Sequence, residues 1–320
     1  MDQGKILVTG ASGQLGSVLT AQLQLKHGID AVIATDLYFN ENFNGPFEIL
    51  DATDIDGLTS LILKHNITQI YHLAAILSAK GEMFPLNTWD INMKTFFNVL
   101  EAARLLGIQK VFFPSSIAVF GNDAPKINTP QNTALNPSTV YGISKVAGEH
   151  WAQYYRKKYG LDIRSIRYPG VIGHQTLPGG GTTDYAVAIY HKAVKGEYYE
   201  CFLKPSTVWP MMFMDDAIRA TIELMEAPKE NLKIENAYNL AAMSFSPSEI
   251  TASIRKFYPE FKTIYQPDFR QEIAESWPSS IDDSCARRDW NWKPKFKIDT
   301  MSATMIKHLK QKYSPELQNY

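Results

Sequence analysis

Cysteine, net charge and long hydrophobic runs are all scarce in this chain of 320 residues. The two cysteines, Cys201 and Cys285, lie far apart and have no spacing typical of metal ligands, so we expect reduced thiols and no metal site. A formal net charge of −1 gives no electrostatic reason to bind nucleic acid or an anionic membrane. No stretch approaches the roughly 18 apolar residues that a membrane span requires.

The remaining composition is typical of a globular enzyme. Hydrophobic residues make up 45% of the chain and charged residues 20%. The length suggests two domains, or one domain with a lobe. No basic residue lies in positions 1–4 before the first apolar run, so we expect no signal peptide and a cytoplasmic location.

A glycine-rich turn follows the apolar run Lys5–Thr9. Gly10 permits a sharp turn, Gly13 lets the backbone approach a pyrophosphate, and Gly16 lets a helix pack close to the strand. The pyrophosphate would lie on unpaired N–H groups at the start of that helix. The expected contacts of the turn are Gly10, Ser12, Gly13, Gln14, Leu15 and Gly16.

An acidic residue, Asp36, ends the second apolar run, residues 31–35, and lies 20 positions after Gly16. Its carboxylate can accept both ribose hydroxyls of an adenosine and would repel a 2′-phosphate. The sequence therefore predicts a site for NAD rather than NADP.

Strands and helices alternate along the first half of the chain, which predicts a parallel sheet covered on both faces. We expect strands at residues 47–51, 69–75, 110–116 and 162–168, and helices at 54–66 and 85–107. The predicted fold is α/β, a Rossmann-type doubly wound parallel sheet with a smaller C-terminal substrate-binding lobe. We expect residues 1–170 and about 206–244 to form the cofactor domain, with 208–225 and 238–240 returning to the sheet, and 171–205 and 245–320 to form the lobe.

A tyrosine and a lysine, Tyr141 and Lys145, lie four positions apart and thus on one face of a helix. The usual tyrosine pKa of about 10 makes a phenol a poor base at neutral pH. A lysine cation and a positive nicotinamide ring would favour the phenolate and lower this pKa. Such pairs are common by chance, but Ser116 ends a predicted strand and can hold the substrate oxygen while Tyr141 takes the proton.

These motifs together resemble the extended short-chain dehydrogenase/reductase family, whose nearest well-known member in pattern is UDP-galactose 4-epimerase. The resemblance includes Leu73-Ala74-Ala75 and the stretch 117–121 after Ser116. It implies Tyr141 as catalytic base, Lys145 as its modulator and ribose ligand, and Ser116 rather than Ser115 as the orienting hydroxyl. Further cofactor contacts that it implies are Asp51, Ala52, Leu73, Ala74, Ala75, Asn92, Tyr168 and Pro169.

The substrate end departs from the sugar-nucleotide enzymes. They carry Arg-Tyr-Phe-Asn, with the asparagine on the diphosphate, where this chain has Gly170 after Arg167-Tyr168-Pro169. A diphosphate needs several donors, and the candidates in the C-terminal part are Arg287 and Arg288, which we interpret as a solvated basic pair. A sugar nucleotide is therefore disfavoured.

The lobe instead resembles the short-chain L-threonine 3-dehydrogenases. The likeness runs through residues 177–186, 208–216, 276–278 and 282–287. It implies oxidation of L-threonine to L-2-amino-3-ketobutyrate with reduction of NAD. Expected substrate contacts are an acid for the ammonium group, hydroxyls for the carboxylate, the catalytic pair and a tryptophan wall: Asp184, Ser78, Thr182, Thr183, Ser116, Tyr141 and Trp277.

Other interpretations remain open. Thr182 or Thr183 could simply cap a helix, and Trp277 could be a core or interface residue. The three glycines at 179–181 suggest a loop that closes over the substrate. Rival functions are a sugar-nucleotide epimerase or dehydratase and a non-catalytic NAD-binding sensor.

A homodimer is the expected assembly. The family commonly pairs the helices expected at 85–107 and 141–159 across a two-fold axis. Their apolar and aromatic side chains could serve that contact or be buried within one subunit: Phe96, Phe97, Leu100, Trp151, Tyr154 and Tyr155.

Overall fold

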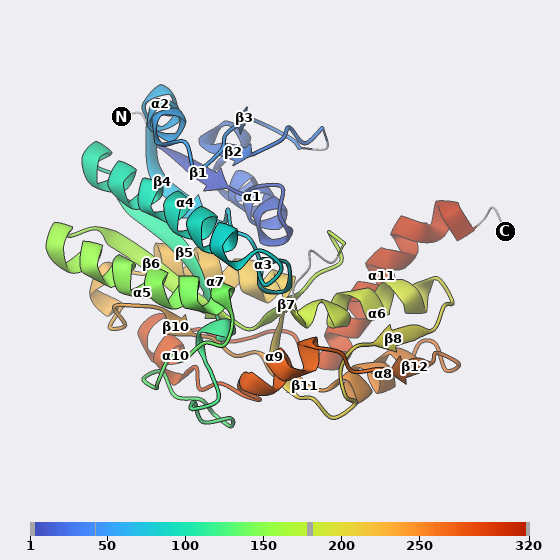
Figure 1. The fold of residues 1–320 in the computed structure, drawn as a ribbon. Helices are drawn as coiled ribbons and strands as arrows, with labels where there is room; N and C mark the ends of the chain where they lie inside the picture. Colours follow the sequence, from blue (N-terminus) through green and yellow to red (C-terminus); the bar gives the residue numbers. More distant parts are fainter. Residues whose placement is uncertain (1–3, 42, 178–181, 318–320) are drawn as a thin grey trace.

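A computed structural model describes residues 4–41, 43–177 and 182–317 (Figure 1). The loop expected to close over the substrate, residues 179–181, lies outside the described residues. In the described ranges no helix is both long and apolar enough to cross a membrane.

The central sheet confirms the predicted Rossmann-type fold. In the described part of the chain it has seven strands in the order β10-β6-β5-β4-β1-β2-β3, and all of its pairings are parallel. The strands are β1 (Lys5–Thr9), β2 (Val32–Asp36), β3 (Phe47–Ile49), β4 (Ile67–His72), β5 (Lys110–Ser116), β6 (Asp162–Tyr168) and β10 (Tyr238–Asn239).

The expected strands at 110–116 and 162–168 have the predicted bounds. The strand expected at 69–75 ends instead at His72, so Leu73-Ala74-Ala75 leaves the sheet at its carboxyl edge. This is the edge where ligands bind in open α/β sheets.

Helices cover both faces of the sheet, as the alternation of side chains along β1 illustrates. Leu7 belongs to the core under one helical layer, whereas Ile6 and Val8 belong to the core under the other. The first layer holds α2 (Ile55–His65), α4 (Pro85–Leu106) and α5 (Val140–Tyr159). The second holds α1 (Gln14–His27), α7 (Met214–Glu226) and α10 (Ser284–Trp290).

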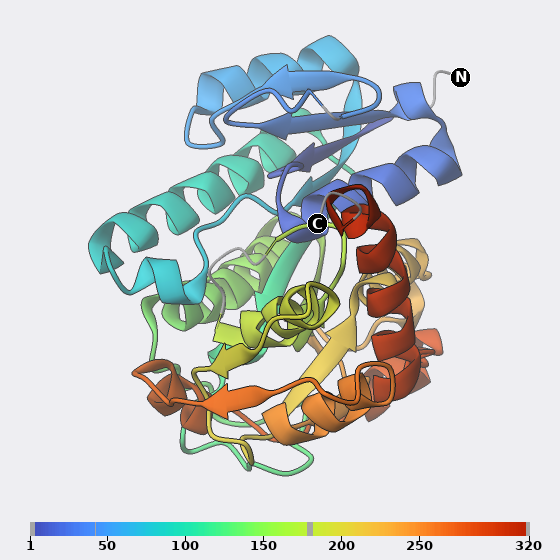
Figure 2. The same cartoon turned by 90° about the vertical axis from the view of Figure 1, so that its right-hand side faces the viewer.

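The second half of the chain adds a lobe beside the carboxyl edge (Figures 1 and 2). Its strands are β7 (Gly170–Ile172), β8 (Tyr199–Cys201), β9 (Trp209–Phe213), β11 (Met243–Phe245) and β12 (Thr263–Tyr265). Its helices are α6 (Tyr185–Val194), α8 (Pro247–Arg255), α9 (Arg270–Ser276) and α11 (Ile298–Leu317). The short helix α3 (Ser78–Gly81) and one-turn 3₁₀ helices at Ile29–Ala31, Ile117–Val119, Thr182–Asp184 and Lys229–Asn231 complete the described elements.

The segment expected to return to the central sheet does so only in part. β10 pairs with β6, as expected, but β9 pairs with β7 and β11 in a separate three-stranded sheet. Trp209, Met211 and Phe213 of β9 face the core of the lobe, while Met212 faces the core beneath α1 and α7. β9 is therefore a buried strand shared between two cores, and this burial on both faces explains its apolar sequence.

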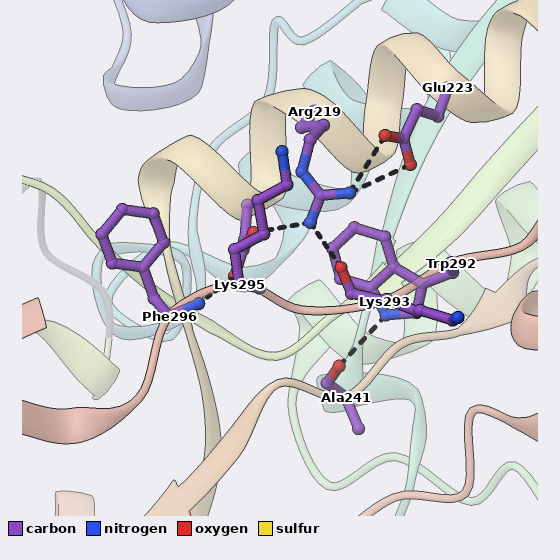
Figure 3. Close-up of polar contacts among 8 residues, drawn as sticks. Arg219, Glu223, Ala241, Trp292, Lys293, Lys295 and Phe296 are labelled. Atoms are coloured by element: carbon purple, nitrogen blue, oxygen red, sulfur yellow. Dashed lines mark hydrogen bonds and ion pairs between the residues drawn. The ribbon is translucent and has the colours of Figure 1, made fainter. Parts of the chain in front are cut away.

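A cluster of polar contacts binds the chain just before α11 to α7 (Figure 3). The buried carboxylate of Asp216 accepts hydrogen bonds from Arg219 Nη2 (2.7 Å) and from the backbone N–H groups of Lys295 (2.8 Å) and Phe296 (3.0 Å). The Arg219 guanidinium also lies 4.6 Å from the ring centre of Trp292. These contacts hold the chain entering α11 against the helix that covers the central sheet.

Candidate active site

The glycine turn between β1 and α1 has the close contacts for which the sequence requires glycine. Gly10 has a φ of +69°, and a Cβ there would lie 2.7 Å from the backbone nitrogen of Ala74. A Cβ on Gly16 would lie 2.1 Å from the carbonyl oxygen of Gly10. Helix α1 therefore approaches the turn as closely as the backbone allows.

The start of α1 fits a pyrophosphate. Its N-cap residue, Gly13, has no side chain to satisfy the first N–H groups of the helix. Two buried polar atoms beside it, Ser12 Oγ and Gln14 Nε2, have no hydrogen-bond partner in the described structure. Asp36 accepts the N–H of Ser12 (2.9 Å) and that of Leu37 (2.8 Å), which orients its carboxylate beside the turn. These groups suit the phosphates and adenosine ribose of a dinucleotide.

A single cleft runs from this turn into the lobe, with about 1050 Å³ of space including its open mouth. Predicted residues that line it are Gly10, Gly13, Gln14, Leu15, Gly16, Leu73, Ala75, Ser78, Ser116, Tyr141, Lys145, Tyr168, Pro169, Thr182, Thr183, Asp184 and Trp277. The other predicted residues, Ser12, Asp36, Asp51, Ala52, Ala74 and Asn92, do not line it.

Besides Asp36, two more of these residues, Asn92 and Asp51, form hydrogen bonds with backbone groups. Asn92 of α4 accepts a hydrogen bond from Ile76 N (2.8 Å) and donates one to Ile76 O (3.1 Å), so its side chain holds the loop after β4. Asp51 accepts from both the N–H and the hydroxyl of Thr53, each at 2.8 Å, at the end of β3.

Sequence reasoning missed several lining residues, among them Leu77, Pro114, Ile117 and Val171. Pro114 was open to prediction, because it lies two residues before Ser116 on the same face of β5. A proline inside a central strand is itself unusual.

Tyr141 and Ser116 meet in the middle of the cleft. Tyr141 lies in the first turn of α5, whose N-cap residue Thr139 accepts the N–H of Gly142 (3.1 Å). Burial raises the pKa of Tyr141 to about 12, and a hydrogen bond with Ser116 acts in the opposite direction. Ser115 turns away and donates instead to Glu149 (2.6 Å), so the hydroxyl beside Tyr141 is that of Ser116.

Lys145 lies one turn further along α5 and is buried. Its ammonium is 4.7 Å from the ring centre of Phe113 and 5.3 Å from that of Tyr141. Burial lowers the pKa of Lys145 to about 7. Burial thus acts against the phenolate of Tyr141 and against the charge on Lys145, and the lowering of the Tyr141 pKa by Lys145 together with a nicotinamide ring stays a prediction.

Hydroxyls and a carboxylate gather at the lobe end of the cleft. Ser78 Oγ and Thr182 Oγ1, from segments 104 positions apart, are both buried and lie 3.3 Å from each other. Helix α6 has Asp184 rather than a threonine at its N-cap, without a side-chain capping bond. The helix-cap interpretation of Thr182 and Thr183 is therefore wrong. Trp277 lines the cleft and also packs on Trp209, with ring centres 5.4 Å apart.

The NAD-dependent epimerase/dehydratase family model matches residues 6–241, which includes the glycine turn, Ser116, Tyr141 and Lys145. The chain belongs to this family. NAD is therefore the cofactor for which the cleft is built, and the glycine turn and Asp36 are the residues that would hold it.

Relatives of similar length resemble the whole chain. An uncharacterized epimerase/dehydratase of Staphylococcus aureus is 48% identical over 313 residues, 96% of this chain and 97% of that protein. A holo structure of a GalE-like L-threonine dehydrogenase from Cupriavidus necator has a TM-score of 0.94 and 52% identity, and the match covers 96% of this chain and 100% of that one. A monomeric L-threonine 3-dehydrogenase from a metagenome has a TM-score of 0.93 and 51% identity over 96% and 99% of the two chains.

We predict that Lys145→Met stabilises the cofactor-free protein while removing activity. The folded-state pKa of Lys145, about 7, lies below its ordinary 10.5. Below pH 7 the buried charge therefore costs its full desolvation, and the free energy of unfolding rises with pH between these values. Urea titrations at pH 6 should show the variant more stable by about 2 kcal/mol, with the difference shrinking toward pH 10.

The control is Lys64→Met, because the Lys64 side chain is 63% exposed and its substitution should change stability little at either pH. Equal or lower stability of Lys145→Met at pH 6 would contradict the desolvation of Lys145.

Proposed function

We propose that this protein is an NAD-dependent L-threonine 3-dehydrogenase that oxidises L-threonine to L-2-amino-3-ketobutyrate. The observation that carries the proposal is the cleft itself, which joins the NAD turn to Ser116 and Tyr141 and then ends among Ser78, Thr182 and Asp184. Similarity to L-threonine dehydrogenases at about 50% identity over nearly the whole chain supports it.

The charge of the cleft fits an amino acid better than a sugar nucleotide. Lys145 is the one lysine or arginine among the described lining residues, and it lies beside Tyr141. Arg287 and Arg288, the alternative diphosphate ligands, are on α10 and pair with Asp283 (2.6 Å) and Asp289 (2.7 Å). A diphosphate would therefore find few cationic donors here.

The reaction divides among three side chains of this chain. Ser116 holds the hydroxyl oxygen of threonine, and Tyr141 as phenolate takes the hydroxyl proton. Lys145 lies 5.3 Å from the Tyr141 ring centre, and in its charged form it would stabilise that phenolate and would hold a ribose hydroxyl of the cofactor. When bound, NAD would supply the acceptor for the hydride on the carbon that bears this hydroxyl, which would convert the alcohol to a ketone.

The two charged groups of the substrate find partners at the lobe end. Asp184 is the acid for the ammonium group. Ser78, Thr182 and Thr183 are hydroxyl donors for the carboxylate. This arrangement places the side-chain hydroxyl of the amino acid toward Ser116 and Tyr141.

NADH formation from NAD and L-threonine tests the proposal. We expect saturable activity with L-threonine and a loss of about a thousand-fold in kcat for Tyr141→Phe, because the variant lacks the general base. D-threonine, L-serine, L-allo-threonine and UDP-glucose serve as comparison substrates, and isothermal calorimetry with NAD checks that the variant still binds the cofactor.

Two outcomes would contradict the threonine assignment. Turnover of UDP-glucose without net NADH, and none of any amino acid, would make the protein an epimerase. NAD binding without oxidation of any alcohol would make it a sensor.

Gly170 gives a second test of substrate class. A Cβ at this position would lie 2.8 Å from Thr183 Cγ2 and 2.4 Å from Met211 Sδ. We therefore propose that the absence of a side chain at 170 lets Thr183 enter the site, in the place where sugar-nucleotide enzymes carry an asparagine. Gly170→Ala should lower kcat/KM for L-threonine by about ten-fold or more, since the intruding carbon displaces Thr183.

The affinity for NAD should not change in Gly170→Ala. Adding Thr183→Ser removes the methyl group that the new carbon would meet, and should restore part of the lost kcat/KM. Full activity of Gly170→Ala would show that Thr183 does not depend on the volume left free by Gly170.

We also propose that the protein is a homodimer through α4 and α5, which run side by side (Figure 1). Phe96, Leu100 and Tyr155 are buried within the subunit, so they do not offer contact surface. Trp151 and Tyr154 are 40% and 44% exposed on the outer face of α5. One similar enzyme is named as monomeric, so the proposal depends on these exposed rings.

Light scattering should give twice the mass of one chain, and Trp151→Glu should shift it to the single mass because a charge would be buried at the interface. Tyr198→Glu is the control, since Tyr198 is also exposed but precedes β8 in the lobe. A wild-type mass of one chain at all concentrations would contradict the dimer.

A further inference from the structure

Lys126 lies in the segment between the 3₁₀ helix Ile117–Val119 and α5, and this segment runs beside α9 (Figure 1). The Lys126 ammonium donates to the carbonyl oxygens of Glu275 (2.9 Å) and Ser276 (2.8 Å) and lies 3.5 Å from that of Trp277. The last carbonyls of a helix have no partner within the helix. Lys126 therefore closes the C-terminal end of α9 with a positive charge, the sign that this end favours.

The backbone of Lys126 holds the other side of the same turn. Its carbonyl oxygen accepts hydrogen bonds from Ser279 N (2.7 Å) and Ser280 N (3.2 Å). One residue thus contacts the chain both before and after Trp277 and Pro278, about 150 positions further along the sequence.

The polar partners of Lys126 in the described ranges are neutral oxygens. Besides the three carbonyls, its ammonium lies 3.5 Å from Asn122 Oδ1, and it forms no ion pair with a described carboxylate. The nearby Glu275 carboxylate is paired with Lys204 instead (2.7 Å). The Lys126 ammonium therefore binds mainly the backbone carbonyl oxygens of this turn.

Trp277 is the side chain that this turn carries into the wall of the cleft. Its ring packs on Trp209, whose own indole N–H donates to Ala274 O (3.0 Å). The indole N–H of Trp277 is buried and has no hydrogen-bond partner within the described structure. Because an indole N–H can only donate and buried donors are normally satisfied, it suits an acceptor on a bound molecule.

We propose that Lys126 is a positioning residue that fixes Trp277 in the wall of the cleft, where the indole N–H donates to the carboxylate of the amino-acid substrate. This inference rests on the proposed function. Lys126 contacts neither the catalytic pair nor the NAD turn, so its influence reaches the substrate through Trp277.

Steady-state kinetics of Lys126→Met test the proposal. This substitution keeps an unbranched side chain, one atom shorter than lysine, and removes its charge. KM for L-threonine should rise about ten-fold, the change that corresponds to the loss of one hydrogen bond to a charged group. KM for NAD should stay within about two-fold, because the glycine turn is untouched. Lys126→Arg, which keeps the donors, should restore most of the affinity.

The matched control is Lys204→Met. The Lys204 ammonium also contacts α9, but through the side chain of Glu275 at the surface. The Lys204→Met variant should have unchanged KM values for L-threonine and for NAD. An equal rise in KM for L-threonine in both lysine variants would mean that any disturbance of α9 has this effect, and would overturn the positioning role.

A double-mutant cycle shows whether Lys126 acts through Trp277. Trp277→Phe keeps a ring and removes the N–H, and should itself raise KM for L-threonine. Adding Lys126→Met to Trp277→Phe should raise KM little further, since the group that Lys126 positions is already missing. If the fold-increase in KM of the double variant equalled the product of the two single increases, the proposal would be overturned.

Hydrogen exchange of the backbone amides of Trp277, Ser279 and Ser280 supplies a readout that does not depend on turnover. Lys126→Met should exchange faster there than the wild type or Lys204→Met. Unchanged exchange overturns the positioning role. A wild type that never oxidises L-threonine overturns the proposed function, and the carboxylate role of Trp277 falls with it even where exchange is faster.

Discussion

A buried carboxylate, Glu149 of α5, is the group on which the geometry of the site depends. It accepts a hydrogen bond from Ser115 of β5 (2.6 Å) and two from the Arg167 guanidinium of β6 (2.9 and 2.7 Å). The side chains of Glu149 and Arg167 are each 1% exposed. Burying such a pair brings little net stability, because both charges lose their hydration. What it does fix is the position of one helix relative to two strands.

That position decides where the catalytic side chains meet. Tyr141, Lys145 and Glu149 follow one another at intervals of four along α5 and so share one stripe of the helix. Ser115 pairs in register with Arg167, and the next pair along the two strands is Ser116 with Tyr168. Holding Glu149 on the first pair therefore places Tyr141 and Lys145 beside the second. The same burial that fixes these groups raises the pKa of Tyr141 and lowers that of Lys145. The packing that positions Tyr141 therefore also opposes its ionisation to a phenolate, and the positive charge of a bound nicotinamide ring would act against this effect.

The sequence predicted the sheet and many of the residues that line the cleft, because their signals are local. Strand β5 has an apolar run that ends at Ser116, and the glycine turn follows directly from β1, so each could be recognised within a few residues. The pairing of β9 with β7 was not predictable in this way, since a short strand buried on both faces has no alternation to assign it to one sheet. The effect of burial on the Tyr141 pKa was not predictable for a related reason. It depends on desolvation, which arises from packing between segments far apart in the chain.

The two ends of the cleft also differ in whether local backbone or packing between distant segments forms them. The cofactor end is built by backbone in close contact, Gly10 against Ala74 and Gly16 against Gly10, where any added carbon would displace the main chain. The lobe end is built by side chains from different segments that occupy neighbouring volumes, so that a larger side chain at one position needs a smaller one beside it. At Gly170 a Cβ would meet the side chains of Met211 and Thr183, which come from two other segments of the chain. On the proposed function, we therefore expect a change of substrate class to need paired changes at contacting positions such as 170 and 183, because a single substitution either leaves a gap or creates an overlap.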